Sequence, residues 1–158
     1  MSFDPEKFMN AAVDPNATVF EVCPEGEYPM MIDTDPKQLI PEELSGVSSK
    51  SGQPYHFWQM NLNCIVNSDA VKAKLGREKV TVRLRLNLDF DAVGNLETGP
   101  NKNVSLGQLR DALSQNQPGW TPARLLGAGP FIGKVKNTTD PKDPNRKYAD
   151  VVKTGKVV

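Results

Sequence analysis

Three cations recur at alternating positions in one stretch of this 158-residue chain: Lys79, Arg83 and Arg85. The stretch from Lys79 to Phe90, KVTVRLRLNLDF, alternates between polar and apolar residues throughout. Strict alternation of large or β-branched apolar residues predicts a strand with one buried face. Alternate side chains of a strand lie on one face about 7 Å apart, so the cations form a row suited to successive phosphates. An ordinary solvated face is the alternative interpretation.

Two aromatic residues open a second alternating stretch, Tyr55 to Val66. Its apolar face holds Trp58, Met60, Leu62, Cys64 and Val66. Tyr55 and Phe57 belong to the opposite face. If that face adjoins the cationic row, it combines rings that stack on bases with charges that neutralise phosphates, as in sequence-tolerant binding of single strands. The expected surface is extended by Lys134, Lys136, Arg146, Lys147 and Tyr148.

No combination of residues in the sequence predicts catalysis. His56 is the only histidine, and it lies beside aromatic residues, which favours a place at the rim of their cluster. The segment from Gly127 to Lys134 departs from a phosphate loop because Val135 stands where Ser or Thr is needed. Cys23 and Cys64 form no CxxC pair and are expected to be free thiols. We therefore expect no enzyme, no cofactor and no metal site.

Charge is unevenly distributed along a chain whose formal net charge is zero. Residues 1–49 carry ten acids and two bases, whereas residues 50–158 carry nine acids and 17 bases. Such asymmetry suggests an acidic segment beside a basic binding body. No apolar run reaches the length of a membrane span, so we expect a cytoplasmic protein without a membrane partner.

The order of expected elements predicts the fold class. Strands are expected at 27–34, 55–66, 79–90, 130–137 and 147–153, and helical segments at 69–76, 105–114 and 121–127. Ser105 and Gln108 form the spacing of a capping box, and long loops are expected at 35–53, with one possible helical turn at 41–44, and at 138–146. Three strands, a helix and two strands is the order of an OB-fold. The expected protein is thus mainly β with one or two short helices, built as a five-stranded OB-fold-like barrel.

Several short motifs resemble a family of small phage-encoded, OB-fold single-stranded DNA-binding proteins. The likeness covers residues 24–154 and consists of PEGEY at 24–28, the polar strand after a Ser/Gly-rich loop, GREKV at 76–80, the Leu-rich segments that end at Gly127, GKVK at 133–136, and the strand with Tyr148. It implies a protein that coats exposed strands during DNA replication or recombination. The chain departs from this pattern at its C-terminus, residues 153–158, which lacks the acidic tail that many such proteins use to recruit partners; the acidic segment here is N-terminal instead.

These observations predict three parts: an acidic, loosely ordered N-terminal extension at 1–23, an OB-fold-like domain at 24–154 and a short tail at 155–158. The expected function is binding of single-stranded DNA, with possible homo-oligomers and with replication or recombination proteins as further partners. The alternative is a protein-interaction or virion-associated β-barrel without a nucleic-acid role.

Overall fold

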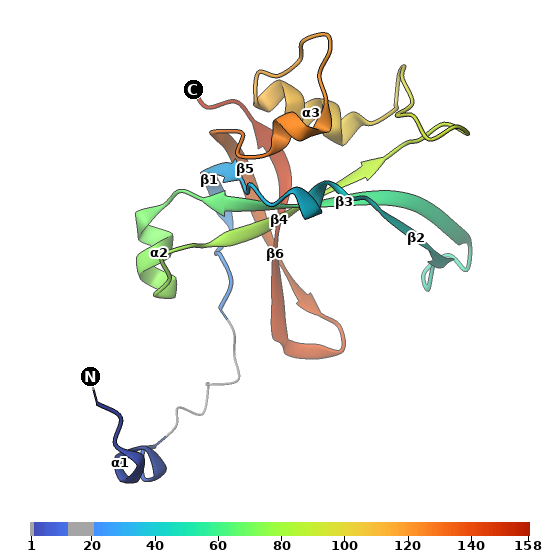
Figure 1. Ribbon diagram of the computed structural model, residues 1–158. Helices are drawn as coiled ribbons and strands as arrows, with labels where there is room; N and C mark the ends of the chain where they lie inside the picture. The colour runs from blue at the N-terminus through green and yellow to red at the C-terminus, as the bar shows by residue number, and fades with distance from the viewer. Residues whose placement is uncertain (1, 13–20) are drawn as a thin grey trace.

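The computed structural model describes residues 2–12 and 21–158 and shows a mainly β protein (Figure 1). Its elements in chain order are α1 (Pro5–Met9), β1 (Gly26–Ile32), the 3₁₀ turn η1 (Pro36–Leu39), β2 (Glu42–Val47), β3 (Pro54–Val66), α2 (Asp69–Leu75), β4 (Thr81–Leu88), α3 (Val104–Ala112), the 3₁₀ turn η2 (Pro122–Leu125), β5 (Phe131–Asp140) and β6 (Asp143–Gly155). The described residues contain three short α-helices, where one or two were expected: α2 and α3 lie in predicted helical segments, α1 was not predicted, and the segment predicted at 121–127 contains the 3₁₀ turn η2.

The strands form one mixed sheet that closes on itself. Neighbours follow the order β1-β5-β6-β4-β3-β2, and β1 also pairs with β3. Strands β1, β5, β6, β4 and β3 therefore make a ring, and β2 extends the sheet along β3. All these pairs are antiparallel except β4 with β6, which run parallel. The expectation of five strands is corrected to six, five of which form the ring.

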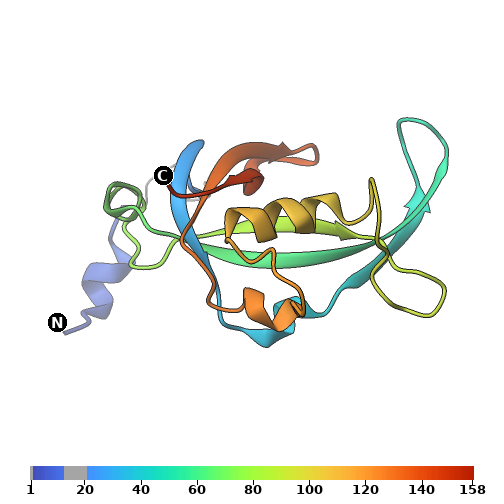
Figure 2. The ribbon, with the colours of Figure 1, turned by 90° about the horizontal axis from the view of Figure 1, so that it is seen from above.

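Alternation along the strands builds the core inside the ring. On β4, Val82, Leu84, Leu86 and Leu88 are buried, and they meet the apolar face of β3 in register. Helix α3 packs against β4 and β6 and covers one side of the ring, as Figure 2 shows from above. The predicted core positions of both alternating strands are confirmed, with Trp58 and Phe90 half-buried at the margin of this core.

The start of α3 differs from the predicted capping box. The helix begins at Val104, its N-cap is Asn103, and Ser105 lies inside the first turn. The Asn103 side chain is engaged elsewhere: its Nδ2 donates to the carbonyls of Asp89 and Glu97 at 3.0 Å, and its Oδ1 accepts from the Asp89 amide at 2.8 Å. Asn103 thus ties the helix to the end of β4 rather than capping its own helix.

Both long loops of the sequence interpretation contain regular structure. Residues 42–47 form β2, which pairs with residues 54–59 of β3, and the helical turn lies earlier, at Pro36–Leu39. Residues 138–140 and 143–146 continue β5 and β6 into a hairpin. Two hairpins, β2–β3 and β5–β6, consequently project beyond the ring (Figure 1). The expected loops at 35–53 and 138–146 are wrong in these parts.

The N-terminal extension contains a short helix where weak order was expected. Asp4 caps α1, since its Oδ1 accepts from the amides of Glu6 and Lys7 at 3.1 and 3.3 Å. No residue of α1 is buried. Residues 1 and 13–20 of the extension lie outside the described residues.

Candidate functional site

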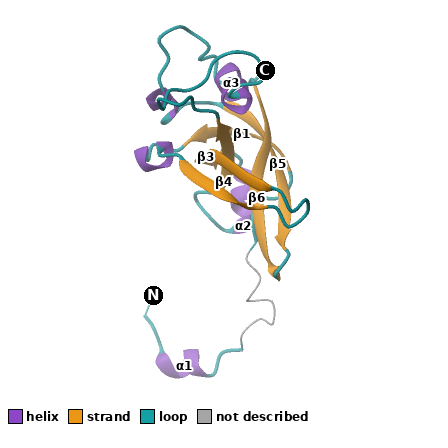
Figure 3. Ribbon diagram, turned by 90° about the vertical axis from the view of Figure 1, so that its right-hand side faces the viewer, coloured by secondary structure: helices purple, strands orange, loops and turns teal. Residues whose placement is uncertain are grey.

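The predicted cationic row lies on the outer face of β4. Arg83 and Arg85 point away from the core, between buried positions, and their cross-strand partners on β3 are Asn63 and Asn61. Strand β6 lies on the other side of β4. Figure 3 shows these three strands of the ring side by side. The outer faces of β3, β4 and β6 therefore make one surface, which we call the β3–β4–β6 face.

Asp150 forms ion pairs with both arginines of this face. Arg83 Nε donates to Asp150 Oδ1 at 2.9 Å, and Arg85 Nη2 lies 3.5 Å from Asp150 Oδ2. The carboxylate side chain is only 11% exposed, whereas the two guanidinium side chains are 40% and 48% exposed. The cluster carries one net positive charge and presents two fixed, solvent-facing guanidinium groups, the geometry that suits phosphate oxygens.

Tyr148, one of the predicted binding residues, lies beside this cluster. The Arg83 Cζ lies 5.8 Å from the Tyr148 ring centroid and the Arg146 Cζ lies 5.5 Å from it. The Tyr148 hydroxyl donates to Asp140 Oδ2 at 3.3 Å. A guanidinium group within about 6 Å of a ring centroid is attracted to the ring, so Arg83, Arg146 and Tyr148 form one group of candidate binding residues.

A cavity of about 330 Å³ opens next to Tyr148. Polar residues dominate its walls, among them Arg77, Thr81 and Lys147, and residues 22–23 close one side. Arg77 Nη2 donates to the Glu21 carbonyl at 2.7 Å, which fixes the N-terminal segment against the start of β4. Lys147 is exposed at this cavity, so the cavity extends the cationic surface toward the β5–β6 hairpin.

Lys79 lies just before β4 and is paired. Its Nζ is 3.6 Å from Asp33 Oδ2, and its side chain is 57% exposed. A pair this exposed contributes about 0–1 kcal/mol to stability. Lys79 therefore keeps freedom to reach a ligand, although an acid partly offsets its charge.

The aromatic candidates lie at the far end of β3. The ring centroids of Tyr55 and Phe57 are 5.7 Å apart, and Tyr55 is 44% exposed. The Tyr55 ring crosses Gly46 of β2, where an added Cβ would lie 2.8 Å from the hydroxyl. Phe57 precedes Asn61, the partner of Arg85, by four residues or about 13 Å along the strand. The rings share the outer face with the arginines but do not touch them.

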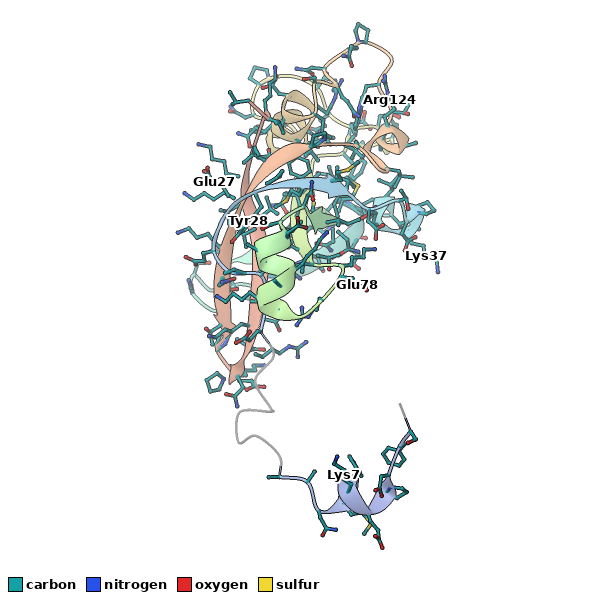
Figure 4. All side chains as sticks on the ribbon, turned by 90° about the vertical axis from the view of Figure 1, so that its left-hand side faces the viewer. Lys7, Glu27, Tyr28, Lys37, Glu78 and Arg124 are labelled. Carbon is teal, nitrogen blue, oxygen red and sulfur yellow. The ribbon has the colours of Figure 1, made fainter. Side chains whose placement is uncertain are left out.

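The two lysines of β5 separate from each other. Lys136 is exposed and lies in register with Asp150, so it adjoins the arginine cluster. Lys134 pairs in register with Glu27 on one side and Lys153 on the other. It lines a second cavity of about 250 Å³, on the part of the ring where Glu27 points outward in Figure 4. Lys134 thus belongs to a neighbouring surface.

Sequence reasoning missed two groups of residues on the β3–β4–β6 face. The first is Asp150, because no local pattern predicts that its strand, β6, lies parallel to β4. The second group consists of four amides: Gln59, Asn61, Asn63 and Asn87. The alternation of β3 and β4 assigned them to the outer face, and the signal that could have singled them out was their number.

The histidine and the two cysteines lie outside the arginine cluster. His56 Nε2 lies 2.6 Å from Glu43 Oε1, and both side chains are more than half exposed. Cys23 and Cys64 are free and buried. Burial raises the pKa of the Cys23 thiol and raises that of Cys64 to about 12, so both thiols stay protonated and weakly nucleophilic at neutral pH.

Comparison with known proteins places the chain in no family: no family model, curated protein or solved structure matches it. Across residues 2–12 and 21–158, no group of three or more His, Cys, Asp and Glu side chains is arranged to hold a metal ion. The helices in the same residues are all too short or too polar to cross a membrane.

Proposed function

We propose that this protein binds single-stranded DNA on the β3–β4–β6 face and protects exposed strands during DNA replication or recombination, including that of a phage. The observation that carries the proposal is the pair of guanidinium groups of Arg83 and Arg85, fixed by Asp150 beside the Tyr148 ring. Fixed cations bind phosphates, and exposed rings on the same face stack on bases.

The pairing order of the ring supports an OB-fold identity. Counting only the ring strands, β1 is first, β3 second, β4 third, β5 fourth and β6 fifth, with α3 between the third and fourth. Oligonucleotides bind OB-folds on the face of the second and third strands and on the loops after the first and fourth strands. In this chain the two strands are β3 and β4, which belong to the β3–β4–β6 face. The two loops are the segment 33–53 and the β5–β6 turn, which border that face.

The binding mode follows from the charges on this face. Arg83 and Arg85 contact backbone phosphates, and Lys79, Lys136, Arg146 and Lys147 contribute further cationic contacts around them. Tyr148 stacks a base next to the arginines, and Phe57 with Tyr55 stacks bases farther along β3. The acids on the face weaken the total attraction, so affinity depends on stacking as well as on charge.

Fluorescence anisotropy of a labelled oligo-dT of about 30 nucleotides tests this proposal, with duplex DNA of the same length as competitor. The matched variants are Arg83→Gln/Arg85→Gln and Lys7→Gln/Arg124→Gln. Each pair removes two positive charges; Lys7 and Arg124 are exposed residues of α1 and η2, outside the parts named above (Figure 4). We expect the first pair to weaken binding more than tenfold and the second to weaken it less than threefold. Equal effects, or no binding by folded wild type, would overturn the proposal.

A second candidate function, a protein-interaction or virion-associated barrel, is favoured by one apolar cavity. About 230 Å³ in volume, it lies where η1, η2 and the start of α3 meet the sheet, and exposed Ile40 adjoins it. Its lining consists of Leu39, Pro41, Met60, Leu88, Phe90, Leu96, Leu106 and Pro122. Three results together would support this alternative. Sedimentation velocity would show ring-shaped or higher oligomers, the Leu39→Glu variant would be monomeric, and the folded protein would not bind DNA.

A further inference from the structure

Four amide side chains cover the centre of the β3–β4–β6 face. Gln59, Asn61 and Asn63 follow one another at alternate positions of β3, and Asn87 on β4 lies opposite Gln59. The aromatic pair Tyr55–Phe57 lies beyond Gln59 at one end of the row, and Arg85 and Arg83 lie directly opposite Asn61 and Asn63. It carries no charge of its own, so its chemistry is that of hydrogen-bond donors and acceptors in adjacent pairs.

These amides are an unfavourable choice for a strand that only faces solvent. Asparagine is depleted in strands, where Thr and other β-branched residues are preferred. Asn61 also has a buried Oδ1 with no hydrogen-bond partner, which costs free energy that a threonine or valine would avoid. An unsatisfied buried polar group in a folded protein calls for a reason beyond packing.

One pair of the row is arranged to take a ligand edge. Gln59 Nε2 donates to Asn87 Oδ1 at 3.2 Å. This bond fixes both side chains and leaves Gln59 Oε1 and Asn87 Nδ2 without a hydrogen-bond partner among the described residues. An acceptor and a donor side by side match a base edge that offers a donor next to an acceptor. Every base has such an edge, but the usual partner of Asn and Gln side chains in proteins is adenine, through its N6 amino group and the neighbouring ring nitrogen.

We propose that the amide row reads base edges, so that binding depends on base identity and favours adenine over the rest of the strand. This inference rests on the proposed single-strand binding and assigns it a recognition element. Arginine is the usual partner of guanine, and both arginines of the face are held by Asp150. Phosphates and stacked rings fix the strand, while Gln59 Oε1 and Asn87 Nδ2 discriminate among the bases.

The test compares two labelled oligonucleotides of about 30 nucleotides. Both are oligo-dT, with four central positions replaced either by adenine or by unsubstituted purine, which stacks like adenine but lacks the N6 amino group. Oligo-dT alone is measured beside them. The test variant is Gln59→Thr/Asn61→Thr/Asn87→Thr, because threonine suits strands and keeps the face polar. The control is Asn95→Thr/Asn116→Thr, at two exposed positions away from the face.

We expect wild type and the control variant to bind the adenine strand at least fivefold more tightly than the purine strand. The triple variant should bind both alike, within a factor of two, with an unchanged circular dichroism spectrum. Equal binding of the two strands by wild type, alongside salt-dependent binding of oligo-dT, would overturn this inference and leave the proposed function standing. A preserved adenine advantage in the triple variant would also overturn it. If wild type binds none of the strands, the proposed function fails and the inference fails with it.

Discussion

Arg83 and Asp150 join two strands of the ring across 67 residues of sequence, through a hydrogen bond of 2.9 Å from Nε to Oδ1. The two residues are also the register pair of the parallel contact between β4 and β6. The carboxylate therefore orients the arginines at the point where the ring closes. One side chain serves both the stability of the barrel and the geometry of its outer face.

Replacing Asp150 by alanine should lower the free energy of unfolding by about 1–2 kcal/mol. The change leaves two arginines without their acceptor, and their partial exposure limits the cost. Urea denaturation measures the effect. Asp111→Ala is the matched control, because Asp111 lies 3.9 Å from Lys156 in a surface pair and should cost less than 1 kcal/mol. Equal losses in the two variants would contradict the structural role of Asp150.

Replacing Phe57 by alanine should weaken binding of oligo-dT by roughly 5- to 150-fold, since each stacked base contributes about 1–3 kcal/mol. Anisotropy titration measures the change. Phe8→Ala removes an exposed aromatic ring of α1, where Phe8 is 68% exposed, and should leave affinity within twofold of wild type. Wild-type affinity in Phe57→Ala would remove this ring from the binding face.

Gly133→Ala should destabilise the protein by about 1–3 kcal/mol because it overpacks the core. A Cβ at Gly133 would overlap Sδ of Met30 and lie 3.2 Å from Cγ1 of Val151. Gly155→Ala is the control in β6, where a Cβ meets no atom within 4 Å. Thermal unfolding should show a lower midpoint for the first variant only. Matching midpoints would show that Met30 moves aside at no cost.

The Cys64 thiol predicts a specific loss of stability at high pH. Burial raises its pKa from about 9 to about 12 in the folded protein, so above pH 9 the unfolded chain releases a proton that the folded chain retains. Stability then falls with rising pH by about 1.4 kcal/mol per unit. At pH 10.5 the advantage of wild type over Cys64→Ala should be smaller than at pH 8 by about 2 kcal/mol, measured by urea denaturation. A pH-independent difference would contradict the raised pKa.

Local patterns predict the ring strands but not how they meet. Alternation placed the core face of β3 and β4 correctly, because one buried face requires it. Strand β2, EELSGV, and the hairpin at 138–146 have no such pattern, since both of their faces are mostly exposed and pairing alone holds them. Ser105 met the spacing rule for a cap, but Asn103 bonds to Asp89 and starts the helix earlier.

The candidate site was predictable in its parts and not in its contacts. Arg83, Arg85, Tyr55 and Phe57 lie on the outer faces of β4 and β3, as strand periodicity dictates. Pairing of Arg83 and Arg85 with Asp150, and the separation of Lys134 from Lys136, depend on ring closure and on the register shift between Lys134 and Val135. Neither is encoded in any short stretch of sequence.

The most direct measurement is the salt dependence of oligo-dT binding by wild type and by Arg83→Gln/Arg85→Gln. Binding through phosphates gives a log–log slope of about −0.7 per phosphate neutralised. We predict a wild-type slope of about −2 or steeper, and a slope shallower by about 1.4 in the double variant, with both proteins folded by circular dichroism. A wild-type slope near zero, or the same slope in both proteins, would contradict phosphate binding by these arginines.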